Sequence, residues 1–254
     1  MFSLIDTHFH PDSETDDVTN NLDRARSCHV DAFIAVGADL ASSRAVNEVA
    51  ASTPDVWATA GVHPHAAAEF DGNMAPYREL ARAPRNCAIG EIGLDYYYEN
   101  SDREAQKEVF KKFLQLAAEL DLPAVIHCRD AYADCLQILG NNLARGQKFE
   151  IHSFTGPEHF VKKFLEMGAF VSFNGIVTFK KADNVRQALD AVPVERLLLE
   201  TDAPYLAPAP HRGRRNQPAY LTHIAEFIAE QKKVDLAELA ERTTENARRF
   251  FRLL

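Results

Sequence analysis

The chain has 254 residues and 46% hydrophobic content, so it can bury a large core, and single α/β barrels reach this length. Its 28 basic and 37 acidic side chains give a net charge of −9, which argues against binding a polyanion through the overall field of the protein. No uncharged apolar run approaches the roughly 18 residues that span a bilayer, and no signal-like segment opens the sequence. We therefore expect a cytoplasmic protein, whose four cysteines are reduced thiols and mostly buried.

Short apolar runs alternate along the chain with longer segments of helical period, the pattern of repeated βα units. The predicted strands are, in chain order, Leu4–Thr7, Ala32–Gly37, Val56–Val62, Cys87–Gly93, Ala124–His127, Phe149–Ser153, Ala169–Phe173 and Arg196–Thr201. Each run is followed by a turn, and most by an amphipathic stretch. Eight βα units predict the α/β class and a TIM (β/α)8 barrel.

The clearest predicted helix is Arg103–Leu120, in which apolar side chains recur at helical spacing. After Pro218 the sequence predicts additional C-terminal helices at Ala219–Lys232, Leu236–Thr243 and Glu245–Leu253. No linker or low-complexity tract divides the chain. We therefore expect residues 1–254 to form a single barrel domain.

Two histidines, His8 and His10, close the first predicted strand one residue apart. Side chains at positions i and i+2 of a strand point the same way, so both imidazoles could converge on one metal ion; for an isolated pair, hydrogen bonding to the backbone is the alternative. A barrel favours the metal, because active sites in this fold are built at the carboxyl ends of the strands. The ionisable residues at predicted strand ends are His8, His10, Glu91, His127, His152 and Asp202.

These residue types are metal ligands. Imidazoles suit zinc and other late transition metals, and carboxylates extend the range to manganese and magnesium. Four histidines and two carboxylates exceed the four ligands of a closed structural zinc site. We predict two divalent ions bridged by Glu91, with Mg²⁺ or Mn²⁺ in use and Zn²⁺ as the alternative. Two ions about 3.5–4 Å apart can clamp the attacking and leaving oxygens of a phosphoryl displacement.

Seven blocks of the sequence, in order, resemble the TatD-type metal-dependent deoxyribonucleases of the amidohydrolase superfamily. The blocks are DTHFH from Asp6, GVHPH from Gly61, IGEIGLDYY from Ile89, HCRDA from His127, HSFTG from His152, ETDAPYL from Glu200 and RRNQP from Arg214. The resemblance covers nearly the whole chain. It departs from the family pattern at Gln217, where the last block usually carries a glutamate.

The resemblance implies 3′-to-5′ exonuclease activity with magnesium or manganese. It implies a metal pair held by His8, His10, Glu91 and Asp202 on one side and by Glu91, His127 and His152 on the other. We expect a water between the metals to attack a terminal phosphodiester, with Asp202 as the base and with His63 and Arg129 steadying the non-bridging oxygens. The predicted catalytic residues are therefore Glu91, Asp202, His63 and Arg129.

The remaining motif positions are candidates for substrate binding. Arg129 lies two residues after His127, where its guanidinium could reach a phosphate bidentately, with a salt bridge at the rim as the alternative. The His65 side chain could lie either in the pocket or at the surface. Tyr96 and Tyr205 could stack on a base, or they could pack against other side chains of the protein. The predicted substrate-binding set is His63, His65, Tyr96, Arg129 and Tyr205, together with Arg214 and Arg215 of the basic loop.

The sequence thus predicts a metal-dependent 3′–5′ exonuclease of single-stranded DNA, with RNA left open as a substrate. We expect a monomer with no membrane partner. One alternative is an amidohydrolase or esterase acting on a small molecule or a D-aminoacyl-tRNA with the same metal centre, because a fold does not fix a function. A non-catalytic metal or nucleic-acid-binding module is another. The basic loop favours a phosphate substrate.

Overall fold

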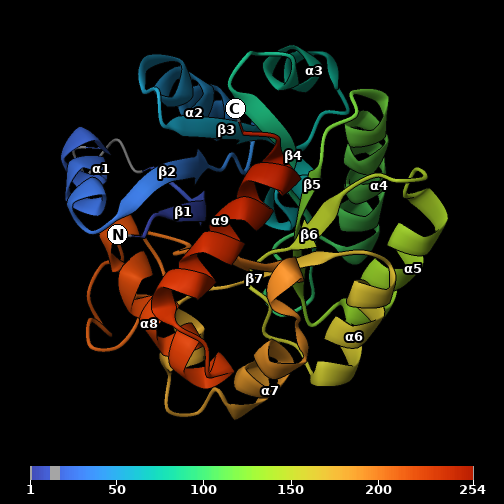
Figure 1. Ribbon diagram of the computed structural model, residues 1–254. Coiled ribbons are helices and arrows are strands. Elements are labelled where there is room, and N and C mark those ends of the chain that lie inside the picture. Colours follow the sequence, from blue (N-terminus) through green and yellow to red (C-terminus); the bar gives the residue numbers. More distant parts are fainter. Residues whose placement is uncertain (1, 12–17, 254) are drawn as a thin grey trace. The chain divides into compact units, whose positions relative to one another are not determined.

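The computed structural model describes residues 2–11 and 18–253. Eight strands alternate with helices along the chain, and their order in the sheet is their order in the sequence, β1 to β8 (Figure 1). The strand pairs are parallel, as a succession of βα units requires. The predicted TIM (β/α)8 barrel is confirmed.

All eight predicted strands are present, with small shifts at their ends. They are β1 (Leu4–Phe9), β2 (Val30–Ala35), β3 (Val56–Ala60), β4 (Asn86–Asp95), β5 (Ala124–Arg129), β6 (Phe149–Ile151), β7 (Phe170–Phe173) and β8 (Leu197–Leu199). Most of their residues are buried, which is why the strands read as nearly continuous apolar runs.

The helices between and after these strands are α1 (Val18–Ser27), α2 (Leu40–Ser52), α3 (Ala75–Ala81), α4 (Arg103–Glu119), α5 (Tyr132–Asn142), α6 (Glu158–Glu166), α7 (Asp183–Ala191), α8 (Leu221–Lys232) and α9 (Leu236–Phe251). Short 3₁₀ turns lie at η1 (Pro64–Glu69), η2 (Gly175–Thr178), η3 (Val194–Arg196) and η4 (Pro218–Tyr220). The predicted helix at Arg103–Leu120 is confirmed as α4. It begins after Asp102, whose side chain accepts a hydrogen bond from the Ala105 N–H at 2.9 Å.

One predicted boundary near the C-terminus is wrong. The sequence predicts two helices, Leu236–Thr243 and Glu245–Leu253, whereas the structure has the single helix α9. The helix continues because both threonine hydroxyls find acceptors. That of Thr243 donates to the carbonyl one turn earlier at 2.9 Å, and that of Thr244 donates to the Ser3 carbonyl at 2.8 Å. Neither hydroxyl therefore competes with the helix for its backbone.

The described residues fall into two compact units that interleave along the sequence. The first comprises the residues up to Ala35, Ser153–Lys162 and those from Phe170 onward, with β1, β2, β7, β8, α1, α7, α8 and α9. The second comprises Val36–His152 and Lys163–Ala169, with β3 to β6 and α2 to α5. That residues 1–254 form one domain stays a prediction.

In the first unit, α9 packs against β1, β8 and α8, and Figure 1 shows α9 beside α8. The face that it buries includes Leu239, Phe250 and Phe251. Burying an apolar side chain of this size contributes about 1.5–3 kcal/mol to folding. This helix therefore anchors the two strands whose carboxyl ends carry the first group of site residues.

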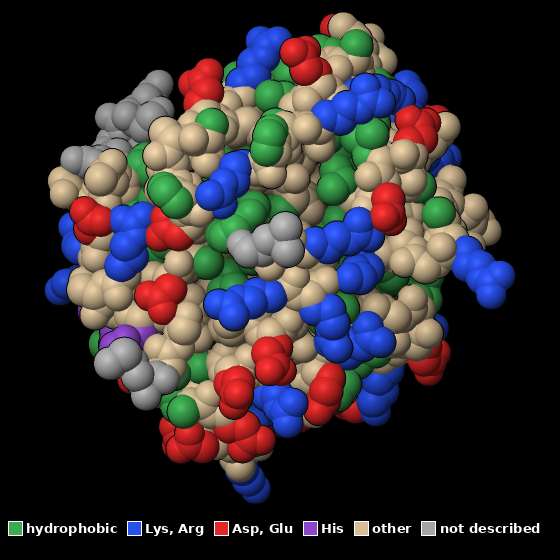
Figure 2. Space-filling view, turned by 45° about the horizontal axis from the view of Figure 1, so that its top comes forward, with side chains coloured by type: hydrophobic (Ala, Val, Ile, Leu, Met, Phe, Trp, Pro, Cys, Tyr) green, Lys and Arg blue, Asp and Glu red, His purple; other side chains and the backbone are tan. Residues whose placement is uncertain are grey.

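The distribution of surface charge and the state of the cysteines agree with what the composition predicts. Figure 2 shows basic and acidic side chains interspersed over one face of the molecule. All four cysteines are free, and all but Cys28 are buried, so the expectation of reduced thiols is met. Among the helices of residues 2–11 and 18–253, none is both long and apolar enough to cross a membrane.

In the second unit, β4 pairs with β3 on one side and β5 on the other, and α4 packs against it. Gly93 of β4 pairs with His127 of β5. Its φ is 141°, and a Cβ at this position would collide with the carbonyl oxygen of His127. The two strands can approach each other here only because residue 93 has no side chain.

We expect Gly93→Ala to lower the free energy of unfolding by about 1–3 kcal/mol, because the alanine must adopt a strained backbone and push β5 away. The matched control is Gly140→Ala in α5, where nothing lies within 4 Å of the added methyl group. That change should raise stability by about 0.5–1 kcal/mol. Urea denaturation of the two variants measures both effects. Equal stability of Gly93→Ala and the unchanged protein would contradict this account.

Candidate metal centre

Three predicted ligands converge in the first unit at the carboxyl ends of β1 and β8. The Nε2 atoms of His8 and His10 lie 3.2 Å apart, and Nε2 of His10 lies 3.7 Å from Oδ1 of Asp202. His8 is fully buried, whereas the side chains of His10 and Asp202 are partly open to solvent. The i, i+2 alternation of β1 therefore brings its two imidazoles together.

A hydrogen-bonded pair of residues holds this group in place. Asp6, on the same face of β1, accepts hydrogen bonds from the Thr201 N–H at 2.8 Å and the Thr201 hydroxyl at 2.6 Å. The Asp202 N–H donates to the His8 carbonyl at 2.9 Å. Burial raises the pKa of Asp6 to about 7, against the opposing effect of its hydrogen bonds. These contacts join β1 to the segment after β8.

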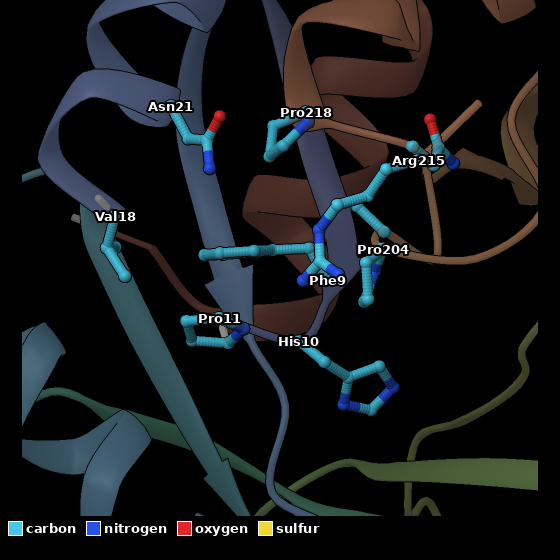
Figure 3. Close-up of a pocket in the computed structure, with 10 residues that line it drawn as sticks. Phe9, His10, Pro11, Val18, Asn21, Pro204, Arg215 and Pro218 are labelled. Atoms are coloured by element: carbon cyan, nitrogen blue, oxygen red, sulfur yellow. The ribbon is translucent and has the colours of Figure 1, made fainter. Parts of the chain in front are cut away.

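A small pocket opens beside His10 in the same unit (Figure 3). The Arg215 side chain extends toward Phe9 in this pocket (Figure 3). The exposed ring of Tyr205 lies 6.3 Å from the His10 ring. Arg214 is exposed at the surface. Besides Phe9, His10 and Arg215, the pocket is lined by Pro11, Val18, Asn21, Ala203, Pro204, Asn216 and Pro218.

A second group of predicted ligands surrounds Glu91 in the second unit. Oε1 of Glu91 lies 2.8 Å from Nδ1 of His127 and 2.7 Å from Nε2 of His152. These two nitrogens are 3.2 Å apart, and Nε2 of His63 lies 3.5 Å from the same carboxylate oxygen. Glu91 and His152 are each only 3% exposed. Strand ends β3, β4, β5 and β6 thus supply one compact set of donor atoms.

The two groups have the donor chemistry of metal sites. Ligand atoms that share an ion at about 2.0–2.2 Å lie roughly 3 Å apart, which matches the spacing around Glu91. Oε1 of Glu91 and the nearby nitrogens of His127 and His152 offer a cluster within which a cation could be held. A carboxylate and several imidazoles fit zinc, manganese or magnesium. The residues present therefore fit a divalent metal.

The buried charges around Glu91 fix its ionisation. Burial alone would raise the pKa of Glu91, but the imidazoles of His152 and His63 and hydrogen bonds from His127 and His152 hold it well below its usual range. Burial would lower the pKa of His127, yet hydrogen bonds to Asp95 and Glu91 raise it overall. For His63, burial holds the pKa well below 6.5. Glu91 is accordingly a carboxylate at neutral pH, and His63 is a neutral imidazole.

The tautomer of His63 follows from a backbone hydrogen bond. Its Nδ1 accepts the N–H of His65 at 3.1 Å, at the start of η1. A neutral ring that accepts at Nδ1 carries its proton on Nε2. This Nε2–H is the end of the ring that faces Glu91. His63 therefore presents a hydrogen-bond donor to the cluster.

Asp95 has a place in this site that the sequence analysis missed. Its Oδ2 accepts hydrogen bonds from Nε2 of His127 and Nε2 of His65, each at 3.0 Å, and the residue is 1% exposed. A carboxylate on the far nitrogen of a ligand histidine fixes the orientation of the ring. The available signal was spacing, because Glu91, Gly93 and Asp95 lie on one face of β4.

We expect Asp95→Asn to weaken metal binding about 10- to 100-fold, because an amide group would then face two imidazole nitrogens that need an acceptor. The matched control is Asp134→Asn in the same unit, since the Asp134 carboxylate pairs instead with Tyr96 and Lys107. Competition for the ion with a chelating dye measures the affinity of each variant. Wild-type affinity in Asp95→Asn would show that this carboxylate does not support the site.

The other predicted residues of the second unit have different surroundings. The Tyr96 hydroxyl donates to Asp134 at 2.7 Å, and the guanidinium of Arg103 lies 4.2 Å from the centre of its ring. Arg129 lies against the rings of Tyr97 and Tyr98, at 4.0 and 4.8 Å from their centres. The Tyr96 hydroxyl is thus bound by Asp134, and one face of its ring is covered by Arg103. The role predicted for Tyr96 stays a prediction.

Glu200 of the first unit is a further buried acid to which the sequence analysis gave no role. Its Oε2 accepts the Ser172 hydroxyl at 2.6 Å, and its Oε1 accepts the Asn174 amide at 3.4 Å. It is fully buried and stands two residues before Asp202. The same i, i+2 spacing that singled out His8 and His10 could have found it.

Histidines and carboxylates gathered at the carboxyl ends of barrel strands are typical of metal-dependent hydrolases. The chain matches the model of the TatD related DNases over residues 5–252. It belongs to this family and is a metal-dependent hydrolase.

The chain is similar in sequence to two curated relatives and in fold to one solved structure, among others. The uncharacterized metal-dependent hydrolase YabD of Bacillus subtilis (strain 168) is 38% identical over 253 residues, which is 98% of this chain and 99% of its own. The 3′-5′ ssDNA/RNA exonuclease TatD of Erwinia tasmaniensis is 39% identical over 239 residues, 91% of this chain and 92% of its own. The crystal structure of YjjV, a TatD homolog from Escherichia coli K12, has a TM-score of 0.93 at 25% identity, covering 99% of this chain and 98% of its own.

Proposed function

We propose that the protein is a 3′–5′ exonuclease that hydrolyses single-stranded DNA, with RNA as a further substrate to be tested. The observation that carries the proposal is the Glu91 carboxylate, which is contacted by imidazole nitrogens from three other strand ends. The name of the Erwinia relative supports a single-stranded nucleic acid as the substrate. A monomer that works in the cytoplasm stays a prediction.

Two divalent ions are proposed to occupy the site. Glu91, His127 and His152 would hold one, and His8, His10 and Asp202 would hold the other. When bound, such ions supply an acidified water and positive charge opposite the phosphate.

The protein side chains divide the remaining work. Asp202 would accept a proton from the attacking water as the general base. The Nε2–H of His63 donates a hydrogen bond to a non-bridging phosphate oxygen, where negative charge increases in the transition state. Arg129 binds a phosphate with its fork of N–H donors. The leaving group is the 3′ hydroxyl of the next nucleotide, so 5′-mononucleotides are released.

The test begins with metal-stripped protein and 5′-labelled single-stranded DNA or matched RNA. Magnesium, manganese and zinc are added separately. A ladder that shortens from the 3′ end only when a metal is present supports the proposal and identifies the preferred polymer. Intact polymers under every metal, from a protein that still binds two ions, would reject it. Ester and amide substrates would then be assayed, since the same donor set can hydrolyse them.

A further inference from the structure

Exposed tyrosines lie next to the second group of site residues. Tyr97 and Tyr98 stand two and three residues after the end of β4 and are 58% and 56% exposed. Their rings meet edge to face, with centres 4.8 Å apart and planes at 90°. A tyrosine ring on a protein surface offers a flat apolar face at little entropic cost. Two such rings together are a surface on which an unpaired base can stack.

An arginine is held against both rings. The guanidinium of Arg129 lies 4.0 Å from the centre of Tyr97 and 4.8 Å from that of Tyr98. Within residues 2–11 and 18–253, no carboxylate forms an ion pair with it. The nearby cations Arg103 and Lys107 both pair with acids. Among the described residues, the N–H donors of Arg129 therefore have no anionic partner, while stacking fixes the plane of the group.

One buried carboxylate ties these residues to the ligand cluster. Oδ1 of Asp95 accepts the N–H groups of Tyr97 and Tyr98 at 3.0 and 2.9 Å, which sets the turn that exposes both rings. Oδ2 of the same carboxylate accepts Nε2 of His127 at 3.0 Å. The Tyr98 ring also meets the His65 ring edge-on, with centres 5.5 Å apart. The tyrosine pair therefore lies at the border of the donor set around Glu91.

We propose that Arg129, Tyr97 and Tyr98 form a binding site for one nucleotide of the single-stranded substrate, with the phosphate on the guanidinium and the base stacked on a tyrosine ring. The inference rests on the proposed nuclease function. It explains how a protein of net charge −9 holds a polyanion locally. Stacking accepts every base but requires that the base be unpaired, so the site selects single strands and tolerates any sequence.

The first experiment measures binding without cleavage. The full chain carrying Glu91→Gln is titrated into a 5′-fluorescent single-stranded oligonucleotide, and anisotropy gives Kd. Adding Tyr97→Leu or Tyr98→Leu should raise Kd roughly fivefold to a hundredfold. Arg129→Ala should raise Kd and lower the salt dependence by about one ion. Tyr98→Trp should bind at least as well as tyrosine, because it restores a stacking face.

A second arginine stacked on an aromatic ring, far from the carboxyl ends of the strands, provides a matched control. Arg85 lies 4.9 Å from the ring centre of Trp57, near the amino end of β3. Arg85→Ala removes the same charge and should leave Kd unchanged. An equal loss of binding in Arg85→Ala and Arg129→Ala would reduce the effect to net charge and overturn the proposal.

Abasic oligonucleotides locate the stacked base. One base is removed at each successive position from the 3′ end, and the effect of the tyrosine substitution is measured again. At one position, the missing base should weaken binding to the parent protein and abolish the difference caused by Tyr98→Leu or Tyr97→Leu. A difference that persists at every position would overturn the proposal. If the wild-type protein degrades DNA while the tyrosine variants bind normally, only this inference fails; if stacking is found without cleavage, only the nuclease function fails.

Discussion

Glu91→Gln is expected to abolish turnover and metal binding at the second group of site residues while the barrel stays folded. Glutamine has nearly the same shape, but it removes the charge that faces His127, His152 and His63. We expect kcat/KM to fall at least about 10⁴-fold, which corresponds to roughly 5.5 kcal/mol of transition-state stabilisation. No other predicted substitution in the site removes a ligand contacted by so many others.

The measurement combines a nuclease assay with an independent count of bound metal. Elemental analysis of the variant should find fewer ions per chain than in the unchanged protein, and circular dichroism should be the same. Glu150→Gln provides a control, because Glu150 is a fully buried acid of β6 outside the proposed ligand set. An active Glu91→Gln protein with its full metal content would disprove the proposed role of Glu91.

The same substitution has a pH signature in the metal-stripped protein. Glu91 has a folded-state pKa well below its usual 4.5, despite burial, because of the imidazoles around it. Its ionised form therefore stabilises the fold at pH values above 4.5, and this contribution is lost as the pH falls through the folded-state value. Urea denaturation between pH 6 and pH 3 should show a shallower loss of stability in Glu91→Gln. An identical slope in both proteins would mean that these imidazoles do not hold the carboxylate in its charged form.

The strand ends were predictable because two simple periodicities coincide there. In a (β/α)8 barrel the site residues follow the strands, and the i, i+2 alternation decides which side chains of a strand share a face. That reasoning brought together His8 with His10, and Glu91 with His127, from sequence alone. The same alternation also places Asp95 on the face of β4 that carries Glu91. Asp95 is not among the predicted site residues, because a single acid near a turn is usually a solvated or capping residue.

The exposure of the tyrosines after β4 could not be predicted from strand or helix periodicity. The sequence DYYY holds three adjacent rings of the same chemistry, and only Tyr96 is among the predicted substrate-binding residues. In the structure Tyr96 pairs with Asp134, whereas Tyr97 and Tyr98 are exposed. The difference depends on which backbone N–H groups the Asp95 carboxylate accepts, and hence on the shape of one turn. No periodicity encodes that choice, since a turn has neither the period of a strand nor that of a helix.

His63→Ala is expected to lower kcat about 10²- to 10³-fold with little change in KM, a loss of about 2.7–4 kcal/mol. The reason is the fixed proton on Nε2, which faces Glu91 because Nδ1 accepts the His65 N–H. A donor held in that direction stabilises charge that develops only in the transition state, so ground-state binding is spared. His63→Gln should recover part of the rate, because its terminal amide can supply an N–H at a similar distance from the backbone.

The pH profile separates this role from that of a protonated acid. Burial holds the pKa of His63 well below 6.5, so the ring stays neutral from pH 6 to pH 8 and contributes no limb to the kcat profile there. His63→Ala should therefore lower kcat by the same factor across this range, and the exposed His159 offers a control whose replacement by alanine leaves kcat unchanged. A limb near pH 6.5 that disappears in His63→Ala would instead make His63 a general acid. A uniform loss is expected because a neutral donor acts through its geometry, and the backbone hydrogen bond that fixes this geometry does not titrate.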